Sequence, residues 1–207
     1  APLVAGLELK RNFRAHVERK LYVHNLGHAV CACRGFLRGC GGIAEAMAVP
    51  AVAAAVRRAM EASARALTGR HPGEFTAAGQ AAHVEDLLRR FANRALGDTV
   101  FRVGRDLARK LAPEERFIGA LRLVAEQGGD TRPVCEGIGA ALHFAAADEQ
   151  GRRHEADDRV RERVAREGVA AFLVSHSGLD PRRHAAEIAA VEEAYRALAP
   201  PAAGRRA

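Results

Sequence analysis

The sequence predicts an all-α protein of seven to nine helices. Hydrophobic residues make up 48% of the 207 residues, whereas aromatic residues make up only 5% and Trp is absent, so the core must consist mainly of Ala, Leu and Val. Alanine-rich sequence with few β-branched or aromatic runs favours helix over strand. Apolar residues also recur at helical spacing along nearly the whole chain, and no segment has a convincing strand pattern.

The first half of the chain contains three long predicted helices. The first begins near Asn12 and runs through "FRAHVERKLYVHNLGHAVCACRGFLRG" to the glycines at positions 39, 41 and 42. Pro50 opens the second, because proline is tolerated in a first helical turn. The third is expected from about Thr76 to Phe91. "NRALGDT" then has the composition of a turn with helix-start residues, and the secondary structure of "VFRVGRDLARKL" stays open.

The second half continues with helices. "APEERFIGALRLVAEQGG" has a proline near its start, acids in its first turn and glycines after its end, which are typical helix boundaries. "RPVCEGIGAALHFAAA" predicts a buried helix and "EADDRVRERVAREG" a polar amphipathic one. "GVAAFLVSHSG" and "PRRHAAEIAAVEEAYRALA" complete the set. We expect residues 1–207 to form a single helical domain, with residues 1–11 as a candidate interdomain connector and residues 200–207 as a flexible tail.

Composition limits the classes of function. The net charge of +7 is compatible with an anionic partner, but the basic residues are scattered without a nucleic-acid module, so neither nucleic acid nor a membrane is the expected partner. No apolar run approaches the roughly 20 residues that span a bilayer, and "APLVAGLELK" does not resemble a signal peptide. Without such a signal, the four cysteines (Cys31, Cys33, Cys40 and Cys135) indicate reduced thiols and a cytoplasmic protein.

The segment "KLYVHNLGH" gathers unusual groups on one helix. Each residue of an α-helix advances about 100°, so with Lys20 at zero, His24 lies near 40°, His28 near 80° and Asn25 near 140°. An amine, an imidazole and an amide therefore face a common space. Oxidation of an alcohol needs such a set, because an uncharged amine accepts the hydroxyl proton while the other two groups hold the oxygen. The plain alternative is the polar surface of an amphipathic helix.

Lysine is scarce in this chain, which draws attention to Lys20. Only three of the 32 basic residues are lysines, and the other 29 are arginines. Lys can lose its proton when it is desolvated, whereas Arg cannot, so we expect burial to turn Lys20 into a base. The opposite side of the same helix carries Val23, Leu26 and Ala29, which are expected to pack inward.

Three ordered blocks carry a family resemblance. "ERKLYVHNLGHAVCA" resembles the signature helix of the polyol-specific long-chain dehydrogenase/reductases, in which a Lys is followed by an Asn five positions on and a His three further; Lys20, Asn25 and His28 fit. The "HN.GH" pattern is similar to the mannitol-1-phosphate 5-dehydrogenase branch. "RFANRALGDTVFRVGRDLARKLAPEERFIGAL" and "EGIGAALHFAAADE" resemble that branch too, so the likeness extends roughly from Glu18 to Tyr195.

The resemblance implies a function and a fold. The chain looks like the all-α C-terminal domain of the mannitol dehydrogenase and 6-phosphogluconate dehydrogenase type. Lys20 would be the general acid/base, Asn25 and His28 would hold the oxyanion, and Arg102 and Lys110 would bind the substrate. The reaction would interconvert D-mannitol 1-phosphate and D-fructose 6-phosphate with NAD(H) and no metal. The family's N-terminal nucleotide-binding domain is absent from this chain, so we expect the chain alone to be inactive.

Other basic residues are candidates from spacing alone. If the second block is helical, Arg102, Arg105 and Arg109 fall at i, i+3 and i+7 on one face, where forked guanidinium groups suit a phosphate monoester. Surface ion pairs are an equally simple role for Arg105 and Arg109. His24 is a candidate pocket residue, and His143 is more typical of a hydrogen-bonded core histidine.

Several alternatives remain open. "GCGGIA", residues 39–44, fits a dinucleotide-binding glycine pattern with Glu61 downstream, but it does not follow a strand. His24, His28 and Cys31, with Cys33 and Cys40 nearby, have spacings that suit a metal site. The enzyme alternative is a mannitol 2-dehydrogenase or hexuronate reductase domain with an unphosphorylated substrate. The alternative of another class is a non-catalytic helical domain that binds an anionic partner.

Overall fold

The computed structural model describes residues 12–198, and all regular secondary structure in that range is helical, so the all-α prediction is confirmed. The candidate connector, residues 1–11, and the candidate tail, residues 200–207, lie outside the described residues. The helices in chain order are α1 (Phe13–Arg19), the π-helix η1 (Lys20–Asn25), α2 (Leu26–Phe36), α3 (Ile43–Met47), α4 (Pro50–Arg70), α5 (Ala77–Phe91), the 3-10 helix η2 (Arg94–Leu96), α6 (Val100–Gly104), α7 (Leu107–Lys110), α8 (Ile118–Glu126), α9 (Arg132–Leu142), α10 (Glu155–Glu167), α11 (Val169–Ser175) and α12 (Ala185–Leu198).

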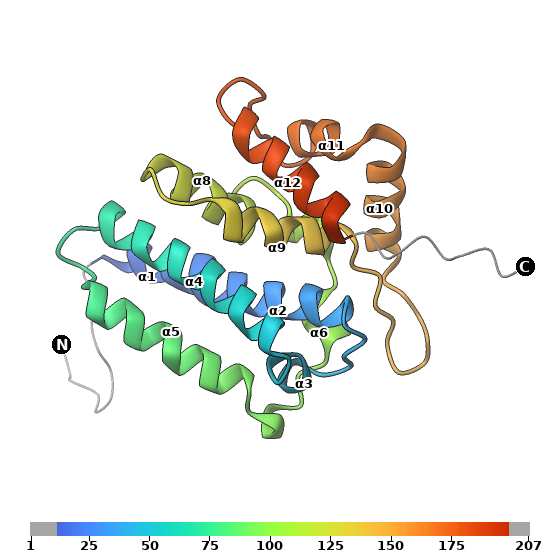
Figure 1. Ribbon diagram of the computed structural model, residues 1–207, viewed down its shortest axis with the longest axis horizontal. Helices are drawn as coiled ribbons and strands as arrows, with labels where there is room; N and C mark the ends of the chain where they lie inside the picture. The colour runs from blue at the N-terminus through green and yellow to red at the C-terminus, as the bar shows by residue number, and fades with distance from the viewer. Residues whose placement is uncertain (1–11, 199–207) are drawn as a thin grey trace, which may run out of the picture.

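The centre of the fold is the pair of helices α2 and α4, which pack along each other. Figure 1 shows α5 on one side of this pair and α9 on the other, with α12 packed over α9. Helices α10 and α11 lie at the far end, and α3 and α6 pack against α2. Helices α1, η1 and α2 follow one another without a break and form one rod, whose second half lies in the middle of the protein.

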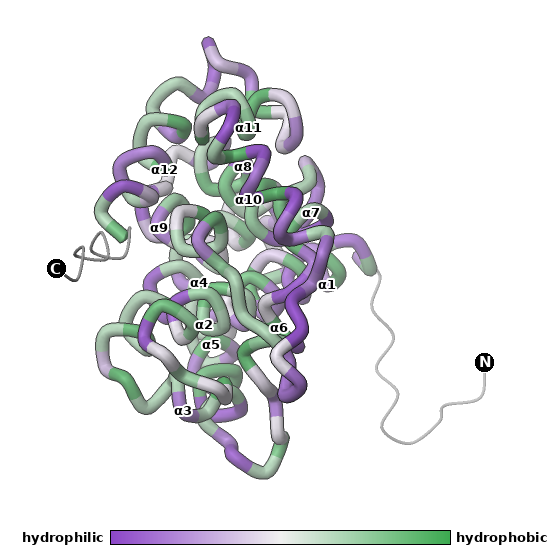
Figure 2. The backbone as a smooth tube through the Cα atoms, turned by 90° about the vertical axis from the view of Figure 1, so that its right-hand side faces the viewer, coloured by the Kyte–Doolittle hydropathy of each residue, from purple (hydrophilic) through white to green (hydrophobic). Residues whose placement is uncertain are grey.

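Burial explains the small, apolar composition of α2. Its side chains face neighbours on nearly every side, and Val23, Leu26 and Ala29 are at most 1% exposed, as predicted. Gly27 permits the close approach of α4, because a Cβ atom there would lie 2.3 Å from the sulfur of Met60. The outer helices bury one side only, and the hydropathy colours in Figure 2 alternate along them accordingly.

Some predicted boundaries are wrong. The helix expected from Ala112 begins only at Ile118, because the residues from Pro113 to Phe117 form turns. The helix expected to include "HFAAA" ends at Leu142. The helix count was also too low, because the short helices α3, α6 and α7 of the described region were not recognised. The start near Asn12 is confirmed: its side chain accepts a hydrogen bond from the amide of Ala15 at 3.2 Å.

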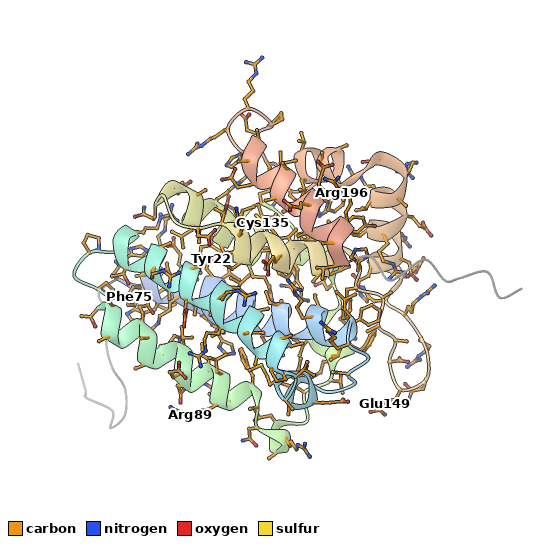
Figure 3. All side chains as sticks on the ribbon, viewed as in Figure 1. Tyr22, Phe75, Arg89, Cys135, Glu149 and Arg196 are labelled. Carbon is orange, nitrogen blue, oxygen red and sulfur yellow. The ribbon has the colours of Figure 1, made fainter. Side chains whose placement is uncertain are left out.

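A close contact anchors η1 to the core. Tyr22 is buried, and its ring lies directly over Gly119 of α8, where a Cβ atom would come within 2.4 Å of the ring. Figure 3 shows Tyr22 among the central helices, whereas Arg89 and Glu149 lie at the periphery. Within residues 12–198, no helix is both long enough and apolar enough to cross a membrane.

Candidate active site

The predicted catalytic residues lie where the first rod changes its helical geometry. Lys20 begins the π-helix η1, Asn25 ends it, and His28 follows in the first turn of α2. The amide of Leu26 donates to the carbonyl of Leu21, five residues earlier, which is the hydrogen bond that defines a π-turn. The prediction of one uninterrupted α-helix is therefore wrong at this point. Single π-turns inside α-helices occur frequently at functional sites.

The π-turn changes where Asn25 lies relative to Lys20. In a regular α-helix a residue five positions on is displaced by about 140° around the axis. A turn closed by a bond between residues i and i+5 contains more residues, so the fifth residue returns closer to the face of the first. In this backbone geometry Asn25 starts nearer to the helix face of Lys20 than it would in a regular α-helix.

The surroundings of Lys20 differ from the expectation. Lys20 is exposed, whereas Asn25 and His28 are half-buried, so all three side chains are at least partly open to solvent. The burial that we expected around the amine is not provided by the described residues. Burial of a side chain depends on the elements that pack over its helix, and the sequence of one helix does not specify those elements.

Residues outside helix α2 fix the position of the His28 side chain. Its imidazole stacks on the ring of Phe91, with centroids 4.7 Å apart and planes 8° apart. Its Nε2 atom lies 3.3 Å from Oδ2 of Asp98 without the geometry of a good hydrogen bond. Burial, together with the nearby positive charges of His24 and Arg102, lowers the pKa of His28 to about 4. The imidazole is therefore neutral near pH 7 and can hydrogen-bond an oxygen without carrying charge.

His24 lies close to His28 and Phe91. Its ring centroid lies 6.2 Å from that of His28 and 5.7 Å from that of Phe91. Burial lowers the pKa of His24, and the positive charges of Arg90 and Lys20 lower it too. His24 consequently lies within the electrostatic reach of the amine, on the same side of the rod as the other candidates.

The segment that carries Asp98 is fastened to a glycine turn. The amide of Ile43 donates to the carbonyl of Asp98 at 2.9 Å, and the amide of Val100 donates to the carbonyl of Gly41 at 2.8 Å. Asp98 also forms an ion pair with Arg102. A cavity of about 260 Å³ opens here, lined in part by Gly42, Phe91 and Asp98. Arg102, although 61% exposed, is thereby tied to the same carboxylate that faces His28.

The glycine pattern itself does not resemble a nucleotide site. The amides of Gly41 and Gly42 both donate to Oε2 of Glu45, at 2.8 and 3.3 Å, so they are already engaged. The pattern follows helix α2 rather than a strand. Its glycines serve the turn that holds Asp98, and the described residues around it do not fit the diphosphate of a dinucleotide.

Lys110 lies on α7 and is buried, with only 3% of its surface exposed. Its ammonium group donates to the carbonyl of Arg105. Burial, together with the nearby guanidinium of Arg116, lowers the pKa of Lys110 to about 8. The positive charges of Lys110 and Arg102 both contribute to the lowered pKa of His28.

The predicted helix face that carries Arg102, Arg105 and Arg109 does not form. Helix α6 ends at Gly104, Arg105 is extended with ψ 166°, and α7 begins only at Leu107, so Arg102, Arg105 and Arg109 do not share one helix. Arg105 stacks over the ring of Phe101, and Arg109 is paired with Asp106 at 2.5 Å and with Glu115 at 3.3 Å. Arg109 is thus largely neutralised by carboxylates, whereas Arg105 remains exposed.

Sequence reasoning missed three neighbours of this site: Phe91, Asp98 and Arg116. Phe91 and Arg116 stand inside the quoted second block, but nothing in that block indicated a contact with His28. Asp98 and Arg102 have the i, i+4 spacing of a helical ion pair, which was the one available signal. Arg116 is half-buried, and Glu115 holds its guanidinium at 3.1 Å.

The remaining candidates lie elsewhere. His143 stacks on Tyr195, and its Nε2 atom lies 2.7 Å from the carbonyl of that residue, which fits a core histidine. Cys31 and Cys33 are fully buried, and burial raises the pKa of each thiol to about 12. In the described part of the chain, no three His, Cys, Asp or Glu side chains are arranged to hold a metal ion. Independence from zinc stays a prediction.

Comparison with known proteins agrees with the sequence resemblance. Residues 12–199 match the family described as mannitol dehydrogenase C-terminal domain. The mannitol-1-phosphate 5-dehydrogenase of Paenarthrobacter aurescens (strain TC1) is 42% identical over 144 residues, which are 70% of this chain and 37% of that protein. The structure of Pseudomonas fluorescens mannitol 2-dehydrogenase in a ternary complex with NAD and D-mannitol matches with a TM-score of 0.73 at 20% identity, over 94% of this chain and 40% of that one. The chain therefore spans well under half the length of either relative.

Proposed function

The chain belongs to the mannitol dehydrogenase C-terminal domain family, and from this premise we propose that it is the substrate-binding and catalytic part of a mannitol-1-phosphate 5-dehydrogenase. The proposed reaction interconverts D-mannitol 1-phosphate and D-fructose 6-phosphate in the cytoplasm. The observation that carries the proposal is the placement of His28, whose neutral imidazole stacks on Phe91 and faces Asp98, the carboxylate that pairs with Arg102.

The proposed chemistry divides between this chain and a bound NAD. In oxidation, Lys20 accepts the proton of the substrate hydroxyl, while Asn25 and His28 hydrogen-bond the oxygen as it becomes a carbonyl. NAD, bound mainly by a separate nucleotide-binding domain, supplies the acceptor for the hydride. In reduction, Lys20 returns the proton. Because Lys20 is exposed here, we propose that the nucleotide-binding domain covers the amine in the working enzyme.

The substrate phosphate is the second part of the proposal. A phosphate monoester carries close to two negative charges and binds best to several cations at once. Arg102, Lys110 and the exposed Arg105 are the proposed contacts. His24 is proposed to line the same space, because its ring stands next to that of His28.

Lys20 offers the direct test. In the enzyme that combines this chain with its nucleotide-binding domain, Lys20→Ala should lower turnover of mannitol 1-phosphate by roughly 10²- to 10⁴-fold, the usual contribution of a general base. Initial rates of NADH formation measure the effect. Arg159→Ala, the loss of an exposed cation on α10 that has no role in the proposed site, serves as the control. Near-normal turnover of the Lys20 variant would overturn the proposed mechanism.

An unphosphorylated substrate is the second candidate. The solved relative was crystallised with D-mannitol, and carboxylates already occupy two of the arginines considered for phosphate, since Asp98 pairs with Arg102 and Asp106 with Arg109. Rates with mannitol and mannitol 1-phosphate, before and after Arg105→Ala, separate the candidates. Phosphate recognition requires a preference for the phosphorylated substrate that this variant reduces.

A further inference from the structure

Asp157 is a buried carboxylate that the proposed reaction does not use. It lies on α10 and is only 3% exposed, against the start of α7. One of its oxygens accepts a hydrogen bond from the amide of Asp106 at 3.0 Å, and the other accepts one from the amide of Leu107 at 2.6 Å. Both oxygens of this acid are thus engaged by the turn that joins α6 to α7.

That turn has an unfavourable backbone conformation. Asp106 has φ 72°, and within residues 12–198 it is the one non-glycine residue with a positive φ. An L-residue adopts this left-handed conformation only when its surroundings stabilise it. Here the stabilising groups are the two hydrogen bonds to Asp157, which come from the amide of Asp106 and the amide that follows it.

The same turn fixes both ends of Lys110. The backbone amide of Lys110 donates to the carbonyl of Asp106 at 3.1 Å. Its ammonium group donates to the carbonyl of Arg105. If Asp106 relaxed to a negative φ, the turn would rearrange, both carbonyls would move and the ammonium would lose its anchor.

We propose that Asp157 is a positioning residue, which places Lys110 in the substrate site by holding Asp106, in the turn between α6 and α7, in its left-handed conformation. This inference rests on the proposed function, because it takes Lys110 as a group that binds the substrate phosphate. It adds a residue of α10, about 50 positions downstream, to the machinery of α7.

The first experiment separates positioning from mere stabilisation. In the intact enzyme with its nucleotide-binding domain, Asp157→Asn should raise KM for mannitol 1-phosphate roughly 10- to 100-fold, with kcat changed by less than about twofold, because a displaced binding group weakens substrate capture. A merely structural residue would instead lower the active fraction, so kcat would fall at unchanged KM, and that result would overturn the proposal. Glu155→Gln, with the same charge change on an exposed acid of α10, should alter neither constant.

A double-mutant cycle tests the path through Lys110. If Asp157 acts through Lys110, then Asp157→Asn should have no further effect on KM in a Lys110→Met background. Multiplying effects would overturn the inference while leaving the role of Lys110 intact. If Lys110→Met alone left KM unchanged, the assignment of Lys110 under the proposed function would fail, and this inference with it.

A rescue variant supplies an independent check. Glycine adopts a positive φ freely, so Asp106→Gly should recover part of the KM loss of Asp157→Asn. Circular dichroism establishes that each variant is folded before its KM is compared. Absence of any rescue would contradict the argument that the left-handed turn is what Asp157 maintains.

Discussion

The imidazole of His28 lies flat against the ring of Phe91, with centroids 4.7 Å apart and planes inclined by only 8°. His28 stands in the first turn of α2, and Phe91 is the last residue of α5. A contact between two helices therefore sets the plane of the imidazole, while its Nε2 atom faces Asp98. Under the proposed function, the orientation of this oxygen-binding group is imposed by distant parts of the chain rather than by its own helix.

Phe91→Leu should weaken catalysis while the protein stays folded. Leucine keeps the site buried, so the free energy of unfolding should fall by less than about 1.5 kcal/mol. The flat stacking partner is lost, and we expect kcat to fall about tenfold because the imidazole is less well oriented. Urea denaturation and initial rates measure the two effects. Phe75→Leu, a buried ring against His16 and His71, is the control; equal losses of kcat in both variants would contradict the role of the stack.

Acid should destabilise the protein through His28. Burial lowers its pKa from 6.5 to about 4, so between these values the unfolded chain binds the proton and the folded chain does not. The contribution to stability is fully present above pH 6.5 and is lost as the pH falls towards 4, by roughly 3 kcal/mol from this group. His24 and His83 have lowered pKa values and act in the same direction.

His28→Gln isolates this contribution. The glutamine does not titrate, so the free energy of unfolding should vary less steeply between pH 4 and 6.5 than in the unchanged protein. Urea denaturation at several pH values gives both slopes. Identical slopes would show that the imidazole is not held neutral by its burial.

The sequence predicted well what depends on local periodicity. The inward packing of Val23, Leu26 and Ala29 follows from a repeat of 3.6 residues, which each helix imposes on itself. The same repeat does not describe Lys20 and Asn25, because a π-turn replaces the regular α-helix between them. Their catalytic roles stay predictions, because position alone does not test chemistry.

What the sequence did not predict depends on distant contacts. In the π-turn at Lys20–Asn25, backbone amides bond to the carbonyl five residues earlier instead of four. The amino acids of that segment do not determine which of the two hydrogen bonds forms. The break at Asp106 is stabilised by Asp157, about 50 residues away, so the three-arginine face could not be rejected from local spacing. The exposure of Lys20 could not be predicted for the same reason, since the burial of a side chain depends on distant elements that pack over it.

Gly119→Ala should disturb the π-turn. A Cβ atom there would lie 2.4 Å from the ring of Tyr22, a rigid group of η1. We expect a loss of about 1–3 kcal/mol in stability from overpacking and a fall in kcat per folded molecule, because η1 carries Lys20 and Asn25. Gly139→Ala is the control, since its Cβ atom would meet α12 at 2.9 Å, away from η1. If both variants kept normal kcat, the position of Tyr22 would not matter for catalysis.

Lys110→Met should make the protein more stable but should weaken substrate binding by the proposed enzyme. Burial lowers the pKa of Lys110 from 10.5 to about 8, so near pH 7 the fold holds a charged ammonium that its surroundings disfavour. Methionine has a similar shape without the charge, and we expect stability at pH 7 to rise by about 1–2 kcal/mol, after subtracting the lost bond to the carbonyl of Arg105. The gain should shrink as the pH rises from 8 to 10.5, because the unchanged protein releases this proton in the folded state first and therefore becomes more stable itself.

Lys20→Met, at an exposed lysine, should leave stability nearly unchanged. Thermal and urea denaturation of both variants at pH 7 and pH 10 measure these differences, and a loss of stability in Lys110→Met at pH 7 would mean that the ammonium's hydrogen bond outweighs its desolvation.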